Sequence, residues 1–227
     1  LLAGFLLAFP GPEPEPGPAG PTASVPGTPV PDTGGLLGAA LRERGVLLGA
    51  TMLTVYVGLE IGVGNWSFSY LVQARALSGS LAGYSVSGYW LGLTLGRFLI
   101  SPVAARIGVT TAGMIYACLA GVAAAVTLAW LSPVATGASV ALMLLGFFLG
   151  PIFPTTMAIA PRLAEARLVP TAIGVMNAAS VVGGAALPWL AGVITQSGGI
   201  RMLLPFALTL AVLQFAAWRP LARWIRG

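Results

Sequence analysis

The chain has 227 residues, of which 57% are hydrophobic and only 7% are charged, whereas roughly a quarter of a soluble domain is charged. This composition cannot cover a water-facing surface, so it indicates a membrane protein. The net charge is +5, but the basic residues are all arginines scattered at the ends of apolar segments, which argues against a nucleic-acid partner. The lack of histidine and the single cysteine, Cys118, exclude histidine-based catalysis, histidine metal sites and an internal disulfide framework. We therefore expect no metal and no cofactor.

Two segments precede the main apolar part of the chain. Leu1–Phe9 is apolar but lacks the charged start and the small-residue cleavage site of a signal peptide, so we interpret it as the end of a truncated transmembrane helix. Nine of the chain's eighteen prolines then fall between Pro10 and Pro31. Because a segment so rich in proline stays extended and solvated, we predict that residues 10–45 form a linker.

Residues 46–227 contain six long apolar segments. Each has about twenty or more residues, the length of helix that crosses about 30 Å of hydrocarbon. The alternation expected of membrane-spanning strands is absent. The sequence therefore predicts an all-α, six-transmembrane-helix bundle. The six segments are Val46–Val72, Leu81–Ala104, Val109–Leu131, Ala135–Ile159, Thr171–Thr195 and Met202–Leu221.

Arginine is distributed unevenly between the two ends of these segments. Nine of the eleven basic residues fall on the side of the Pro-rich linker, and only Arg75 and Arg201 fall on the other side. In membrane proteins the cytoplasmic loops carry the excess of basic residues. We therefore expect an integral protein of the plasma or inner membrane, with the linker and both ends of the six-helix bundle in the cytoplasm.

The first of the six segments contains one charged residue, Glu60. A charge at the centre of a bilayer costs at least about 2.5–3.5 kcal/mol and persists where it faces the bundle interior or a wet cavity. At about 100° per residue, Glu60 shares a helix face with Tyr56, Ser67 and Tyr70, while Asn65 points the opposite way. This polar face predicts a cavity wall or a polar ligand site. The alternative is a structural carboxylate that bonds a neighbouring helix or is kept neutral by burial.

Four further residues are candidates for a role in a transport pathway. Arg97 lies a turn or two inside the end of its helix, where it either anchors the helix by reaching the surface or holds a gate closed. Pro151 and Pro154 predict a break in their helix, which either gates a pathway or only bends a bundle helix. Asn177 is either a helix–helix contact or a ligand contact.

Glycine recurs at intervals of four residues. The spacing occurs at Gly88, Gly92 and Gly96, and again at 58–62 and 146–150. Glycines at this spacing form a flat face that lets another helix backbone approach closely, so we predict a tightly packed bundle.

Together these features resemble the C-terminal six-helix half of a major facilitator superfamily transporter. That family has twelve helices in two halves, joined by a long cytoplasmic loop between helices six and seven. GYWLGLTLGRFLISPVAARIG, at Gly88–Gly108, resembles the glycine–arginine motif of helix eight. A Gly-x-Glu and a Gly-Pro-x-x-Pro are similar to those of the fucose-permease-like branch, and here they are Gly58/Glu60 and Gly150/Pro151/Pro154.

The resemblance implies a secondary active transporter that moves a small molecule by alternating access. A sugar-like substrate and proton coupling through Glu60 are further hypotheses. The implied partners are the small-molecule substrate, the lipid bilayer and a missing N-terminal six-helix half. The expected substrate-binding or proton-coupling residues are Tyr56, Glu60, Ser67, Tyr70, Tyr89, Trp90 and Asn177, and the expected gating residues are Arg97, Arg106, Pro151 and Pro154.

Two other classes of function fit the sequence less well. A membrane-embedded enzyme needs a nucleophile with a base, a metal cluster or paired acids, and the apolar segments offer none of these, so we expect a protein that is not an enzyme. The other class is a transport-inactive sensor or structural membrane protein of the same fold. Ligand binding without flux in proteoliposomes would indicate this second class.

Overall fold

Every regular element in the described part of the chain, residues 33–226 of a computed structural model, is a helix. Residues 1–32 and 227 lie outside the described residues, and with them the predicted helix end at Leu1–Phe9 and most of the predicted linker. The last part of the linker differs from the prediction, because α2 (Thr33–Ala40) is helical rather than extended. The proline-rich run of the linker ends at Pro31, and the leucines and alanines that follow it favour a helix.

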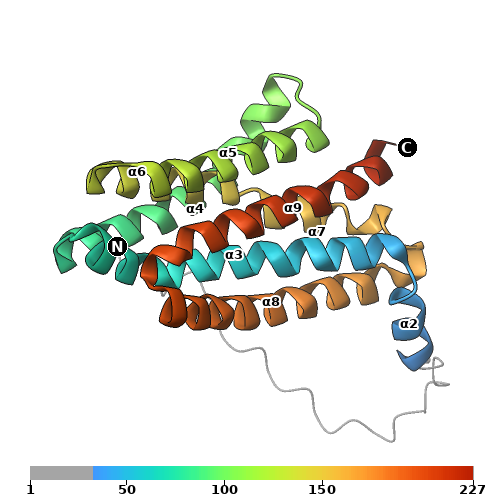
Figure 1. Ribbon diagram of the computed structural model, residues 1–227. Helices are drawn as coiled ribbons and strands as arrows, with labels where there is room; N and C mark the ends of the chain where they lie inside the picture. Colours follow the sequence, from blue (N-terminus) through green and yellow to red (C-terminus); the bar gives the residue numbers. More distant parts are fainter. Residues whose placement is uncertain (1–32, 227) are drawn as a thin grey trace, which may run out of the picture. The chain divides into compact units, whose positions relative to one another are not determined.

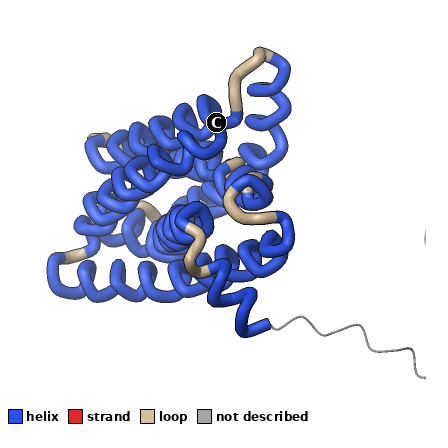
Figure 2. Tube along the Cα trace, turned by 90° about the vertical axis from the view of Figure 1, so that its right-hand side faces the viewer, coloured by secondary structure: helices blue, strands red, loops and turns tan. Residues whose placement is uncertain are grey.

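The six predicted spans appear as six long helical segments, each close to its predicted bounds (Figure 1). Short loops join them, as Figure 2 shows. Five of the six are long and apolar enough to cross a membrane. The sixth, α4, has the length but is less apolar, because it is rich in glycine and serine and carries Arg97. The segments are α3 (Arg44–Arg75), α4 (Gly79–Arg106), α5 (Thr111–Leu131), α6 (Ala135–Leu149) with α7 (Ile152–Ala158), α8 (Val169–Gly198) and α9 (Leu203–Arg226), and the short 3-10 turns are η1 (Ala160–Arg162), η2 (Ala166–Leu168) and η3 (Ile200–Met202).

Side-chain caps fix the starts of α4 and α5. The Ser78 hydroxyl accepts a hydrogen bond from the backbone N–H of Leu81 at 3.4 Å, and the Thr110 hydroxyl accepts one from Gly113 at 3.1 Å. Such caps satisfy amides that have no partner within the helix. Gly108 has a positive φ of 72°, which glycine adopts without strain, and this allows the tight turn between α4 and α5.

The predicted break at Pro151 is present. α6 ends at Leu149, and α7 begins at Ile152. Proline has no backbone N–H and its ring disturbs the preceding turn, which weakens a helix at that point. Helices α4, α8 and α9 continue through Pro102, Pro188 and Pro220, so the break at Pro151 is not the effect of a proline alone. Pro154 lies in the first turn of α7, where a missing N–H is tolerated.

α4 and α6 approach each other through glycines on both helices. A Cβ atom at Gly92 or Gly96 would overlap the backbone of α6, and a Cβ atom at Gly146 or Gly150 would overlap the backbone of α4. The predicted close approach of helices is therefore reciprocal. Gly88 belongs to the same row but leaves ordinary room, because an added Cβ would lie 4.0 Å from its nearest neighbour.

α3 packs chiefly against α8 and α9, whereas α4 and α5 pack chiefly against α6. Hydrogen bonds reinforce the contact between α3 and α8, since Thr54 donates to the carbonyl of Ala179 and the Trp66 indole donates to that of Pro188, both at 3.0 Å. Figure 1 shows α3 and α8 side by side along most of their length. The bundle therefore contains two groups of helices, and the polar contacts between α3 and α4 lie where these groups meet.

Candidate functional site

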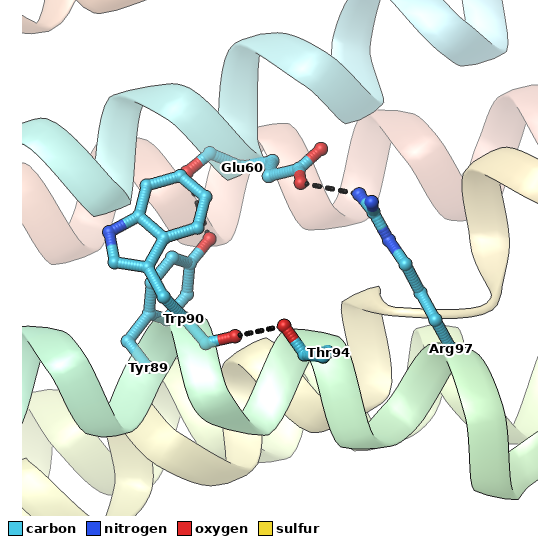
Figure 3. Close-up of polar contacts among 5 residues, drawn as sticks. All are labelled: Glu60, Tyr89, Trp90, Thr94 and Arg97. Atoms are coloured by element: carbon cyan, nitrogen blue, oxygen red, sulfur yellow. Dashed lines mark hydrogen bonds and ion pairs between the residues drawn. The ribbon is translucent and has the colours of Figure 1, made fainter. Parts of the chain in front are cut away.

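An ion pair joins α3 to α4 inside the bundle. An oxygen of the Glu60 carboxylate lies 3.0 Å from a guanidinium nitrogen of Arg97, as Figure 3 shows. The Glu60 side chain is only 9% exposed, whereas that of Arg97 is 42% exposed. Glu60 therefore bonds a neighbouring helix, as one of its two predicted alternatives required. The sequence did not predict its partner, because Arg97 lies on another helix.

Two aromatic residues of α4 surround the backbone of α3 at Glu60. The Tyr89 hydroxyl donates a hydrogen bond to the Glu60 carbonyl at 2.8 Å, and the Tyr89 side chain is completely buried. Trp90 stands nearly edge-on to Tyr89, with the ring centroids 5.2 Å apart. It also lies against Gly64, where an added Cβ would meet the Trp90 ring and force it to move. These contacts hold α4 close to α3 and place Arg97 within reach of the carboxylate (Figure 3).

Tyr56 lies one helical turn before Glu60 on the same face of α3. Its side chain is completely buried, and its ring is tilted against that of Phe153 at a centroid distance of 6.0 Å. Its hydroxyl has no hydrogen-bond partner among the described residues. A buried hydroxyl without a partner is costly, so it is available for a contact that another arrangement or a ligand would supply.

Ser67 and Tyr70 do not join this group, although they share its helix face and are buried. The Ser67 hydroxyl donates to the carbonyl of Val63 in its own helix. The Tyr70 hydroxyl accepts a hydrogen bond from Arg75 at 2.8 Å. Ser67 and Tyr70 therefore make contacts separate from those of Glu60, and ten residues of helix separate Glu60 from Tyr70 by about 15 Å.

Arg75 completes this second polar cluster. Its two terminal nitrogens donate to three carbonyls at the end of α5, those of Ala129, Trp130 and Ser132, at 2.7 to 2.8 Å. A cation is favourable at the C-terminal end of a helix, where the last carbonyls lack partners within the helix. The cluster therefore fixes the end of α5 against α3.

The remaining predicted residues lie at exposed positions. Asn65 is exposed, as its helical phase predicted. Asn177 is exposed on α8, and its side chain forms no hydrogen bond with another described residue. Arg106 is exposed in the last turn of α4. The structure thus brings Tyr56, Glu60 and Arg97 together with the aromatic pair, and it does not bring Asn177 or Arg106 to them.

Arg97 also lines a cavity of about 500 Å³ between α4, α5 and α7. Pro154 forms part of the wall, and Pro151 is buried at the start of α7. The ion pair is therefore connected to the open space beside the helix break. The sequence did not single out the hydroxyl residues of this wall, because an isolated serine or threonine carries no signal in a single sequence. These residues are Ser101, Thr111 and Thr155.

Comparisons with known proteins agree with this architecture. The family model described as Major Facilitator Superfamily matches residues 61–225. The chain is 30% identical over 197 residues to bypass of stop codon protein 6 of Saccharomyces cerevisiae, covering 82% of this chain and 39% of that protein. It is 29% identical over 167 residues to a glucose/galactose transporter of Brucella abortus, covering 73% of this chain and 39% of that protein.

Two solved structures show the same fold. The fucose:proton symporter FucP of E. coli matches with a TM-score of 0.70 at 15% identity, covering 83% of this chain and 45% of that chain. A second structure of FucP, in the outward conformation, matches with a TM-score of 0.69 at 16% identity and the same coverage. The chain therefore spans less than half the length of the relatives that it matches.

These findings confirm the predicted resemblance, the all-helical fold and the expectation of an integral membrane protein. The family model covers most of the chain, including five of the long helical segments in full or nearly so and the end of α3. The chain belongs to the Major Facilitator Superfamily.

Proposed function

We propose that this chain forms the C-terminal half of a secondary transporter that moves a sugar-type molecule across the membrane by alternating access, in symport with a proton. A sugar-type substrate is supported by the names of two relatives, a glucose/galactose transporter and a fucose:proton symporter. A second six-helix half is supported by the coverage, which reaches only 39–45% of each relative's length. The excess of arginine on one side supports a cytoplasmic linker.

The ion pair between Glu60 and Arg97 carries the proposal. Alternating access needs contacts that exist in one arrangement of the helices and break in another. A single bond of 3.0 Å between two helices is suited to such a role. The carboxylate lies inside the bundle while the guanidinium reaches the cavity. Protonation of Glu60 would remove its attraction to Arg97. The released Arg97 side chain could then move within the cavity beside α7, so that proton binding changes the shape of this cavity.

The residues around the pair form the proposed substrate contact. Tyr56 offers a buried hydroxyl without a hydrogen-bond partner among the described residues, and the half-buried Trp90 offers aromatic surface. Tyr89 is completely buried and would act by holding the backbone at Glu60. Small-molecule sites combine apolar walls with a few placed polar groups. Asn177 stays a proposed contact because its exposed amide is free to meet a substrate. We assign Tyr70 to the structural cluster around Arg75 and Ser67 to a hydrogen bond within its own helix.

The experiment uses full-length protein in proteoliposomes and compares two transport modes. Proton-driven accumulation of a labelled sugar needs coupling, whereas exchange of labelled for unlabelled sugar does not. We expect Glu60→Gln to lose accumulation and to retain exchange. The matched control is Glu165→Gln, which removes the carboxylate of an exposed ion pair with Arg167 at 2.9 Å. This control should keep both modes.

Two outcomes would count against the proposal. Full accumulation by Glu60→Gln would show that this carboxylate is not the coupling acid. Sugar binding by the unaltered protein, measured as thermal stabilisation, without flux in either mode would instead favour the alternative of a transport-inactive sensor.

A further inference from the structure

Among the described residues, those that line the cavity beside Arg97 are cationic, hydroxyl-bearing or apolar, and none is acidic. Arg97 and Arg162 contribute guanidinium groups from α4 and η1, and Ser101, Thr111 and Thr155 contribute hydroxyls. One guanidinium nitrogen of Arg97 forms the ion pair with the Glu60 carboxylate. Arg162 forms no ion pair with a carboxylate in the described part of the chain. The wall therefore carries an uncompensated positive charge.

The start of α5 adds to this positive charge. Thr111 is the first residue of this 21-residue helix and lines the cavity. The capping hydroxyl of Thr110 binds the amide of Gly113, so other amides of the first turn have no partner within the helix. The positive end of the helix and two arginines together favour a ligand with several anionic oxygens, as in a phosphate group.

An apolar groove continues from this cavity between α4, α5 and α6. The two spaces share Ala104, Val109 and Met114, and the groove has a volume of about 280 Å³. Its lining is entirely apolar and reaches Cys118. An apolar groove of this kind, open to the surrounding medium and joined to a cationic cavity, matches a ligand with an anionic head and a hydrocarbon tail.

Along α4 the cavity and the groove cover nearly the same residues, but along α5 and the α6–α7 span the groove lies deeper. There the cavity lies against the start of α5, α7 and η1, whereas the groove reaches Phe147 and Phe148 at the end of α6. The groove extends from there along α5 as far as Cys118, about 10 Å further from the helix start. A phospholipid has the same order, with its phosphate at the level of the helix ends and its chains toward the bilayer centre.

We propose that an anionic phospholipid occupies this site, with its phosphate group between Arg97, Arg162 and the start of α5 and one acyl chain in the apolar groove. The site differs from the substrate contact proposed above, and the inference does not depend on which molecule is transported. Each arginine close to an anionic lipid surface contributes a factor of about five in affinity. The expected preference is therefore for phosphatidylglycerol over the zwitterionic phosphatidylcholine.

The first experiment removes charge from the cavity. Full-length protein is purified in detergent and titrated with each of the two lipids, and native mass spectrometry counts the bound lipid molecules. We expect Arg162→Gln to weaken the binding of phosphatidylglycerol about fivefold. The control Arg167→Gln removes the same charge from the neighbouring exposed loop and should leave binding unchanged. Equal binding of both lipids by the unaltered protein would overturn the proposal, as would unchanged binding by Arg162→Gln.

The second experiment tests the groove and the source of the phosphate. Ala117→Phe fills the groove and should reduce lipid binding, whereas Ala120→Phe, at an exposed position of the same helix outside the groove, should not. Both variants must keep the thermal midpoint of the unaltered protein in phosphatidylcholine to be compared. Inorganic phosphate should neither stabilise the protein nor displace the lipid. If phosphate alone binds as strongly, or if Ala117→Phe retains the lipid, no acyl chain occupies the groove.

Discussion

A single methyl group at Gly96 would test how closely α4 and α6 must approach. A Cβ atom at this position would overlap the carbonyl group of Phe147, which belongs to the backbone of α6 and cannot rotate away. The two helices would have to separate, and overpacking of this kind typically costs about 1–3 kcal/mol. At Gly88, about two helical turns earlier, the same methyl group would meet its nearest neighbour at 4.0 Å. Alanine favours a helix over glycine by about 0.5–1 kcal/mol, so Gly88→Ala should be neutral or slightly stabilising.

The comparison is made by thermal unfolding of the full-length protein in detergent. A loss of about 2 kcal/mol corresponds to a fall of about 4–8 °C in the midpoint for a chain of this size. A maleimide dye can report unfolding, because Cys118 is only 2% exposed in the folded chain. If Gly96→Ala unfolds at the same temperature as Gly88→Ala, the reciprocal glycine contact is not tight and the packing argument fails.

Two further predictions concern buried polar groups. Gln214 of α9 is completely buried, and neither polar atom of its amide has a hydrogen-bond partner among the described residues. Gln214→Leu should therefore raise the free energy of unfolding by about 1–2 kcal/mol. A fall in the thermal midpoint would show that the amide has a partner after all. Arg75→Gln removes the cation that binds Tyr70 and the end of α5 and should cost about 1–3 kcal/mol. The exposed Arg201 serves as its control, and equal midpoints for Arg75→Gln and Arg201→Gln would refute the role of the cluster.

Features that depend on one helix at a time could be predicted from the sequence. The length and hydropathy of each segment determine the span, so α3 differs from its predicted bounds by only two or three residues. The break near Pro151 could also be predicted, because proline acts on its own helix, although Pro102, Pro188 and Pro220 leave their helices continuous. The phase of α3 likewise predicts that Asn65 is exposed and that Glu60 faces the interior.

Features that depend on two helices could not be predicted in this way. Glu60 pairs with Arg97, and this pairing depends on the position of α4 along the axis of α3. Tyr89 and Trp90 determine that register through their contacts with Glu60 and Gly64. The same limit explains Tyr70, which shares a helix face with Glu60 but bonds Arg75. A helical phase gives the direction of a side chain and leaves its neighbours undetermined.

The break between α6 and α7 separates two mechanical elements within one span. α6 is held against α4 by Gly146, and this fixed contact ends at Gly150. Beyond the break, α7 carries Pro154 and Thr155 along the cavity wall, and proline leaves fewer backbone hydrogen bonds across the joint than a continuous helix would have. We therefore expect α7 to tilt about the joint while α4 and α6 stay in contact. Such a tilt would change the width of the cavity without any repacking of the glycine contact between α4 and α6.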